Sequence, residues 1–313
     1  MRALLLKILG ALLFLTALVM WVSRAPDWPV ESLVARWAPP PSQFIDLDGQ
    51  LVHLRDVGPR DDPEPLVLVH GTSDSLHTWE GWVPALSARH RVISFDLPGF
   101  GLTGPSAAGD YRGDTYARFV LALMDRLQVQ RFAIGGNSLG GEVAWRTAWL
   151  APQRVTRLIL VDAAGPAFES DSVPIGFLIA RVPLLNQGFE TLLPRPMVVA
   201  SVRNVYGDPS RVSDELVDRY YQMALREGNR RALVQRLQQN QRGADAERLR
   251  DLKQPTLILW GGKDKLIPPS VGRQFQQALP GSELVVFDDL GHVPQQEDPA
   301  RTVAAVKAFL ERR

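Results

Sequence analysis

The sequence predicts an α/β protein in which a mostly parallel sheet is flanked by helices and interrupted by one helical insertion. Short apolar runs alternate with segments of helical spacing along most of the chain, a pattern typical of parallel sheets. The alternation stops after residue 165 and resumes at about residue 253. We therefore predict an N-terminal apolar segment, a proline-rich linker, an α/β core in two parts, and a helical cap, over residues 1–24, 25–42, 43–165 with 253–313, and 166–252.

Composition excludes several classes of function. The chain has 313 residues and a net charge of +1, which argues against a nucleic-acid partner. It has no cysteine, and this excludes disulfides, a thiolate nucleophile and cysteine-ligated metals. None of its five histidines has the spacing of a metal-ligand motif. We therefore expect neither a metal nor a cofactor.

The N-terminal segment has the length and composition of a membrane-spanning helix. Residues 8–22 are uncharged and almost wholly apolar, and extension back to Ala3 gives about the 20 residues that a span needs. A cleaved signal peptide is the competing interpretation, but its one small-residue site, Ser23-Arg24-Ala25, is followed by Pro26, which disfavours cleavage. We therefore expect an uncleaved single-pass anchor that attaches the protein to a membrane.

A slight charge bias predicts the orientation of this anchor. Arg2, Lys7 and the amino terminus precede the apolar stretch, whereas Arg24 and Arg36 follow it. Positive charge favours the cytoplasmic side, so the globular domain is expected on the extracytoplasmic side.

The linker and the first strands follow. Residues 30–37 are expected to form a short interfacial helix, and the prolines after it an extended spacer. The globular domain should begin near Gln43 with a hairpin over residues 44–54, because apolar alternation continues on both sides of Asp48-Gly49.

Six further strands complete an eight-stranded sheet, and helices cross between them. These strands are expected over residues 65–70, 91–95, 131–135, 155–161, 255–260 and 283–287. The core helices are expected over residues 79–88, 115–127, 142–150, 271–279 and 299–312. In the insertion, helical patterning covers residues 184–193, 196–205, 213–227 and 230–241. The arginines of the insertion alternate with acids and are expected on a solvated face, with a specific anion site as the less favoured alternative.

A serine lies at a strand-to-helix turn in Gly136-Asn137-Ser138-Leu139-Gly140. The turn is so sharp that Gly136 and Gly140 must lack a Cβ atom, and it lifts the serine hydroxyl clear of the sheet. The helix that follows presents unpaired N–H groups to a developing oxyanion.

Three residues with complementary chemistry follow three strands of this sheet: Ser138, Asp264 and His292. A serine hydroxyl is hardly ionised near neutral pH, so nucleophilic attack requires a base, and neutral histidine is suited to that role. The imidazole in turn requires a carboxylate on its other nitrogen. The order Ser, Asp, His therefore predicts a catalytic triad.

From about Gln43 to Arg313 the chain resembles the α/β-hydrolase fold family. The motifs that carry the resemblance are His70-Gly71-Thr72, Asp96-Leu97-Pro98-Gly99-Phe100-Gly101, Gly136-Asn137-Ser138-Leu139-Gly140-Gly141, Gly262-Lys263-Asp264, and Gly291-His292-Val293-Pro294 with Glu297-Asp298-Pro299. The resemblance implies Ser138 as nucleophile, His292 as base and Asp264 as acid. It also implies an oxyanion hole formed by the backbone N–H groups of Thr72 and Leu139.

Other polar residues near the strand ends have rival interpretations. Asp162 ends the strand before the insertion, where some family members carry the acid, although Asp264 is favoured. His70 is expected to be structural, and Asp96 to accept hydrogen bonds from backbone N–H groups of its own loop. His77 is expected to face the pocket, whereas Trp79 is assigned a packing role.

We therefore expect a serine hydrolase that acts on a small ester with an apolar acyl group. Ser138 excludes the dehalogenases and epoxide hydrolases of this fold, which use an aspartate nucleophile. The elbow also resembles that of carbon–carbon bond hydrolases, but His70-Gly71-Thr72-Ser73 replaces their glycine-rich oxyanion stretch. Carbon–carbon hydrolysis of a vinylogous diketone and acyl transfer are the alternatives, and a non-catalytic ligand-binding protein of the same fold is less favoured.

Overall fold

A computed structural model describes residues 2–182, 188 and 190–312. Its centre is one eight-stranded sheet with the order β1-β2-β4-β3-β5-β6-β7-β8. The strands are β1 (Ser42–Leu47), β2 (Gln50–Val57), β3 (Leu66–Val69), β4 (Val92–Phe95), β5 (Phe132–Asn137), β6 (Val155–Val161), β7 (Thr256–Gly261) and β8 (Glu283–Phe287). The β1–β2 and β2–β4 pairs are antiparallel and the remaining pairs are parallel. The predicted fold class is thus confirmed.

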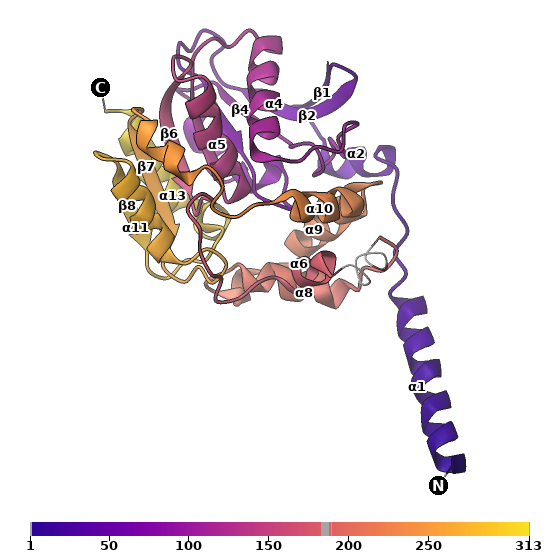
Figure 1. Ribbon diagram of the computed structural model, residues 1–313. Helices are drawn as coiled ribbons and strands as arrows, with labels where there is room; N and C mark the ends of the chain where they lie inside the picture. The colour runs from indigo at the N-terminus through magenta and orange to yellow at the C-terminus, as the bar shows by residue number, and fades with distance from the viewer. Residues whose placement is uncertain (1, 183–187, 189, 313) are drawn as a thin grey trace.

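Helices cover both faces of the sheet (Figure 1). The core helices are α3 (Val83–Leu86), α4 (Gly113–Arg126), α5 (Leu139–Leu150), α11 (Pro269–Ala278), α12 (Pro294–Glu297) and α13 (Pro299–Leu310). One apolar cluster joins α4, α5 and α11 to the sheet, and another packs α3 and α13 against it. β3, β4, β5 and β7 are buried along their whole length because both faces of these strands are covered.

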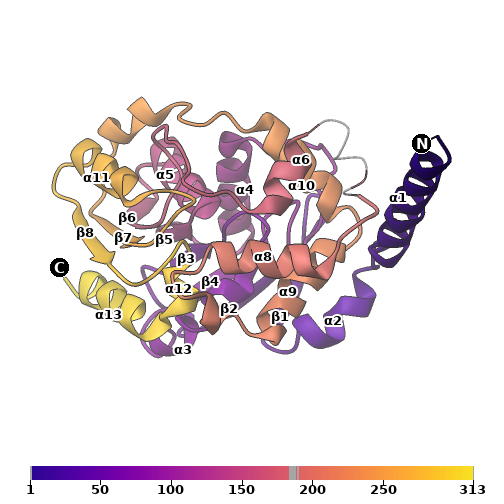
Figure 2. The same cartoon turned by 90° about the horizontal axis from the view of Figure 1, so that it is seen from below.

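The insertion between β6 and β7 lies across one end of the sheet (Figures 1 and 2). It contains α6 (Ile175–Arg181), α8 (Arg195–Asn204), α9 (Asp214–Leu225) and α10 (Asn229–Gln239). A short 3₁₀ turn, η2 (Pro209–Arg211), lies between α8 and α9, and another, η3 (Ala246–Asp251), follows α10. Half of the helix expected over residues 184–193, namely residues 184–187 and 189, lies outside the described residues. The end of the sheet that these helices cover is the one at which β5 and β7 end, where the predicted site residues lie.

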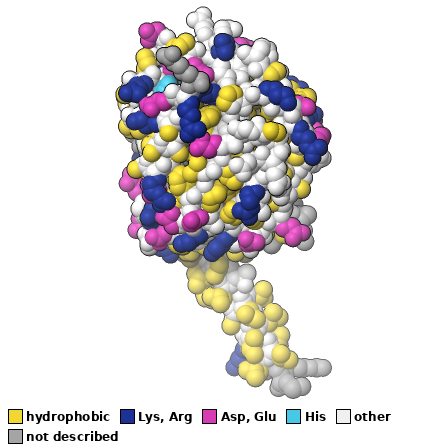
Figure 3. Space-filling view, turned by 90° about the vertical axis from the view of Figure 1, so that its left-hand side faces the viewer, with side chains coloured by type: hydrophobic (Ala, Val, Ile, Leu, Met, Phe, Trp, Pro, Cys, Tyr) yellow, Lys and Arg dark blue, Asp and Glu magenta, His cyan; other side chains and the backbone are white. Residues whose placement is uncertain are grey.

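The first helix, α1 (Arg2–Val22), stands away from the globular body as an apolar rod (Figure 3). From Leu4 to Val22 it is long and apolar enough to cross a membrane, and none of that stretch is buried. The next helix, α2 (Glu31–Trp37), instead packs on the globular domain. Its Leu33 and Trp37 form a buried cluster with Leu102 of the core and Met223 of α9. The linker therefore joins α1 to both the core and the cap.

Two expectations about secondary structure and exposure are wrong. The helix expected over residues 79–88 is instead the 3₁₀ turn η1 (Leu76–Trp79) followed by the four-residue α3. Gly81 and Pro84 account for this break, since both disfavour a continuous helix. The arginines of α10 are also not all solvated, because Arg230 is 2% exposed and Arg236 is 5% exposed.

Candidate active site

The strand-to-helix turn between β5 and α5 carries Ser138 with a positive φ of 56°. A Cβ atom on Gly136 would lie 2.1 Å from the carbonyl oxygen of Gly140, and one on Gly140 would lie 2.0 Å from that of Val69. Both distances are far too short for a side chain. The requirement for glycine at these two positions is therefore confirmed, and the backbone strain at Ser138 is maintained by close packing around it.

His292 and Asp264 form a buried hydrogen-bonded pair. Asp264 follows β7, and its Oδ2 accepts a hydrogen bond of 2.7 Å from His292 Nδ1. Its Oδ1 accepts from the backbone N–H groups of Leu266, at 2.8 Å, and Ile267, at 3.0 Å. With its proton on Nδ1, the neutral imidazole leaves Nε2 free to accept a proton from another group.

Asp162 lies beside this pair, and its environment shifts the pKa of its carboxyl group. The carboxyl group is fully buried at the end of β6, and its Oδ1 accepts from the N–H of Gly261 at 2.9 Å. Burial, and then repulsion from the Asp264 carboxylate, raise the pKa of Asp162 well above its usual range. Because His292 donates to Asp264, the geometry favours Asp264 over Asp162 as its partner.

The same three side chains place ligand atoms within 4.8 Å of one another, a spacing that a metal ion could use. The ring nitrogen of His292 and a carboxylate oxygen of Asp264 are, however, already joined by their hydrogen bond. The raised pKa of Asp162 also makes it a weaker ligand, because metals bind the deprotonated carboxylate. The His–Asp pair therefore accounts for the cluster without a metal.

The loop after β3 lies directly against the serine turn. A Cβ atom on Gly71 would be 3.2 Å from the Cβ of Ser138, so the loop leaves no room for a side chain there. His70 stabilises this loop, as expected, with its Nδ1 2.7 Å from the carbonyl oxygen of Gly71 and its Nε2 accepting from the N–H of Leu97. Next to Gly71, Thr72 lines a cavity together with Ser138.

Asp96 and His77 stabilise the structure around the site. Asp96 accepts from the N–H groups of Leu76 and Leu102, each at 2.7 Å, as expected of a loop carboxylate. His77 does not line the cavity beside Ser138: its Nε2 donates to the carbonyl oxygen of Trp37, at the end of α2. The expectation that it faces the pocket is therefore wrong. Trp79 is fully buried, in agreement with a packing role.

Glu297 and Asn137 hold the His292 loop, and sequence reasoning assigned no role to either. The carboxylate of Glu297 accepts from the N–H of Gly291 at 2.8 Å, and from those of Gly207 and Asp208 in the cap at 2.9 and 2.7 Å. Asn137 donates to the carbonyl oxygen of His292 at 2.9 Å. The motif around Glu297 was visible in the sequence, but its partners in the cap were not.

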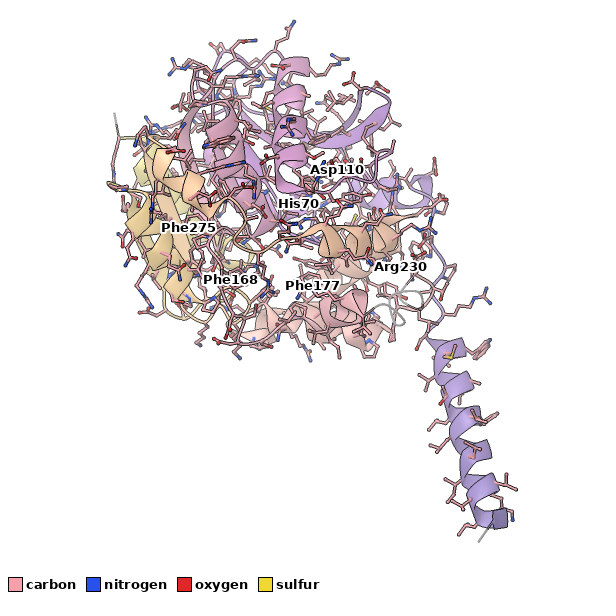
Figure 4. All side chains as sticks on the ribbon, viewed as in Figure 1. His70, Asp110, Phe168, Phe177, Arg230 and Phe275 are labelled. Atoms are coloured by element: carbon pink, nitrogen blue, oxygen red, sulfur yellow. The ribbon has the colours of Figure 1, made fainter. Side chains whose placement is uncertain are left out.

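Ser138 and His292 both line a cavity of about 150 Å³ between the core and the cap. Most of the other lining side chains are apolar and belong to the cap, among them Phe177, Leu193, Met197, Val198, Val202 and Leu233. Phe177 extends from α6 into the space between cap and core (Figure 4). Polar side chains, Ser138 and His292 among them, thus share this cavity with a larger apolar lining.

This arrangement matches known proteins at the level of family. A model of the alpha/beta hydrolase fold matches residues 64–299. The chain belongs to the α/β-hydrolase fold family. Among its relatives is the dihydrolipoyllysine-residue acetyltransferase component of an acetoin cleaving system from Pseudomonas putida, with 34% identity over 87% of this chain and 70% of the relative. Another is a 2-hydroxy-6-oxo-2,4-heptadienoate hydrolase from a strain of the same species, with 31% identity over 86% and 95%.

Solved structures of α/β hydrolases superpose on most of the chain. A meta-cleavage product hydrolase from Pseudomonas fluorescens has a TM-score of 0.74 and 27% identity, covering 86% of this chain and 97% of its own. A membrane phospholipase A has a TM-score of 0.71 and 24% identity, covering 99% of this chain and 98% of its own. At that identity the second likeness concerns the fold alone.

Proposed function

We propose that this α/β hydrolase is a serine esterase that cleaves a carboxylic ester with an apolar acyl group. The observation that carries the proposal is the cavity that Ser138 and His292 both line beneath apolar cap side chains. Such a cavity suits an acyl chain, because the chain leaves water for an apolar surface while its carbonyl carbon reaches the serine.

The geometry supports a two-step reaction. Ser138 Oγ attacks the carbonyl carbon while its proton passes to His292 Nε2, and Asp264 stabilises the imidazolium through its hydrogen bond to Nδ1. The N–H groups of Thr72 and Leu139 stabilise the oxyanion. The intermediate collapses as His292 returns the proton to the leaving alcohol oxygen, and an acyl-serine remains. A water molecule, deprotonated by His292, then releases the acid and regenerates Ser138.

Hydrolysis of p-nitrophenyl esters of increasing acyl length tests this proposal. Full-length protein in detergent micelles is expected to hydrolyse them with a rate that peaks at one length, and Ser138→Ala is expected to reduce turnover to that of a mock preparation. Turnover retained in Ser138→Ala would refute the role of the serine. Absence of turnover at every length in folded protein would refute the esterase assignment.

A relative with 31% identity that is a carbon–carbon hydrolase favours a second candidate, cleavage of a vinylogous diketone. The same serine and histidine would serve, since water attack on a carbonyl is common to both reactions. A chromogenic ring-fission product assayed beside the p-nitrophenyl esters separates the two. The esterase proposal predicts turnover of the esters only, and cleavage of the dienoate with inert esters would replace it.

We also propose that α1 is an uncleaved membrane anchor that leaves the catalytic domain on the extracytoplasmic side. The residues after α1 are part of the fold: Ala25 is 4% exposed, and its carbonyl oxygen accepts a 2.7 Å hydrogen bond from Arg230. Its N–H donates to Thr191 of the cap. Cleavage after Ala25 would remove α1 and leave a charged terminus beside these contacts. The intact mass of purified protein tests retention of α1, and protease protection in spheroplasts tests the side.

A further inference from the structure

A second branch of the site opens from Ser138 on the side of the proposed oxyanion donors. This cavity of about 80 Å³ is lined by Ser138, Thr72 and Leu139. It shares Ser138, Thr72, Phe177 and Leu266 with the apolar cavity, so the two branches meet at the serine. Its chemistry differs from that of the first branch, because three guanidinium groups line it: Arg181 of α6, Arg236 of α10 and Arg242 after α10.

Arg236 is buried with little to balance its charge. The residue is 5% exposed, and its Nε has no hydrogen-bond partner among the described residues. Its Nη2 atom lies 3.4 Å from a carboxylate oxygen of Glu142, which also lines the branch. That carboxylate already accepts a shorter hydrogen bond of 2.9 Å from Arg146. A buried guanidinium with a free N–H group favours an anionic ligand, because an anion supplies both the charge and the acceptor.

The two arginines at the mouth of this branch increase the positive charge. Burial, and then the charges of Arg242 and Arg236, lower the pKa of Arg181. The guanidinium of Arg242 lies 4.9 Å from the ring centroid of Phe168, which also lines the branch. The Nη1 atom of Arg242 lies 3.5 Å from the carbonyl oxygen of Phe168. Like charges held together repel one another, and a bound anion removes that repulsion.

An adjoining cavity, which Glu142 and Arg236 also line, contains a cluster of balanced charges. Next to the second branch, Arg146 binds Asp114 at 2.7 Å and Asp245 at 2.9 Å, in addition to Glu142. Arg248 binds the same two aspartates. These charges neutralise one another, whereas among the described residues that line the second branch Glu142 is the one acid beside three arginines.

We propose that the second branch binds an oxyanion group, phosphate or carboxylate, carried by the alcohol part of the substrate. The inference rests on the proposed esterase function. With the acyl chain in the apolar branch and the carbonyl carbon at Ser138, the alcohol oxygen lies within reach of His292, which lines the first branch, and the remainder of the alcohol extends into the second branch. The substrate class is therefore an ester of an apolar acid with an anionic alcohol. The arginines bind and orient this alcohol, and the bonds made and broken remain those of ester hydrolysis.

Pairs of anionic and neutral esters test the proposal in full-length protein. Octanoylglycerol 3-phosphate is compared with octanoylglycerol. In the second pair, 4-(octanoyloxy)benzoate is compared with 4-(octanoyloxy)benzamide. The wild type is expected to favour the anionic member in kcat/KM by about tenfold, the effect of one charge-assisted contact. The phosphate pair and the carboxylate pair show which oxyanion the branch prefers. A ratio measured on one sample does not depend on how much of the protein is folded.

The variants locate this preference in the structure. Arg236→Gln is expected to bring the ratio close to one, and Arg181→Gln, at the exposed mouth, to lower it severalfold. Arg231→Gln is the matched control, because Arg231 lies on the same helix, pairs with Glu190 and does not line the branch. Its ratio should equal that of the wild type. Arg181→Gln decides the matter even where Arg236→Gln folds poorly.

Two results would overturn the inference. A wild-type ratio near one, or a preference unchanged in both Arg236→Gln and Arg181→Gln, removes the anion subsite while leaving the esterase function intact. An anion preference restricted to the acyl side, measured with 4-nitrophenyl hydrogen glutarate against 4-nitrophenyl pentanoate, contradicts the placement of the alcohol. Failure to hydrolyse any ester, anionic or neutral, would instead refute the proposed function itself.

Discussion

Acidification should weaken this protein through one buried histidine. His77 is 4% exposed; its Nε2 lies 2.7 Å from the carbonyl oxygen of Trp37, and its Nδ1 lies 2.9 Å from Ser75 Oγ. A carbonyl oxygen can only accept, so the neutral ring carries its proton on Nε2 and accepts from the serine hydroxyl on Nδ1. A second proton on Nδ1 would remove that acceptor.

Burial lowers the pKa of His77 from 6.5 to about 4. The charged groups around it oppose one another, with Asp96 and Glu80 raising the pKa and Arg219 and Arg55 lowering it. The unfolded chain takes up this proton below about pH 6.5, whereas the folded protein takes it up only near pH 4. The stability that depends on neutral His77 is therefore complete above pH 6.5 and is lost as the pH falls from 6.5 to 4. Linkage gives a loss of about 2 kcal/mol between pH 7 and pH 5.

Urea denaturation of full-length protein in micelles at pH 7 and pH 5 measures this loss. His77→Gln is the control, because a glutamine amide can still donate to the carbonyl oxygen of Trp37 but does not titrate. The free energy of unfolding of the wild type should fall by about 2 kcal/mol more than that of the variant over this interval. Equal decreases in both proteins would refute the assignment of a neutral, buried His77.

Two further substitutions test the site. Asp264→Asn should lower kcat for p-nitrophenyl esters by about ten-thousandfold, because an amide favours the wrong imidazole tautomer, and steady-state kinetics on folded variant would show it; a loss below tenfold would point to Asp162 as the acid. Gly140→Ala should reduce the free energy of unfolding by about 3 kcal/mol or more, since its Cβ would lie 2.0 Å from the carbonyl oxygen of Val69. Urea denaturation measures this loss, with Gly176→Ala as the control, because the new Cβ there would lie 3.7 Å from Ser201 Oγ. Equal stability of the two variants would contradict the packing of the turn.

The parts of the fold set by local pattern could be predicted from the sequence. Buried parallel strands are continuous apolar runs, so β3, β5 and β7 were recognisable before any contact was known. Parallel strands place the residues that follow them at one edge of the sheet, so Asp264 and His292 could be predicted to lie close together, and the structure joins them by a hydrogen bond. The glycines around Ser138 indicated a turn that is too tight for side chains at those positions.

The predictions that were wrong concern contacts between segments that are distant in the sequence. His77 was expected at the pocket, but its partner is Trp37, forty residues earlier. The arginines of α10 follow a solvated pattern, yet Arg230 is buried because the linker covers it and Arg236 because the core lies beneath it. Helical spacing describes which residues share a face and not what covers that face. The anion subsite therefore became visible only once α6 and α10 were placed beside Ser138.

Covalent labelling of Ser138 tests the central claim most directly. A fluorophosphonate probe reacts with a serine whose hydroxyl is activated by a neighbouring base, and intact mass followed by peptide mapping locates the adduct. We predict one adduct on the wild-type protein, at Ser138, with slow labelling of His292→Ala and none of Ser138→Ala. A folded wild-type protein that does not react, or that carries the adduct on another serine, would contradict the account.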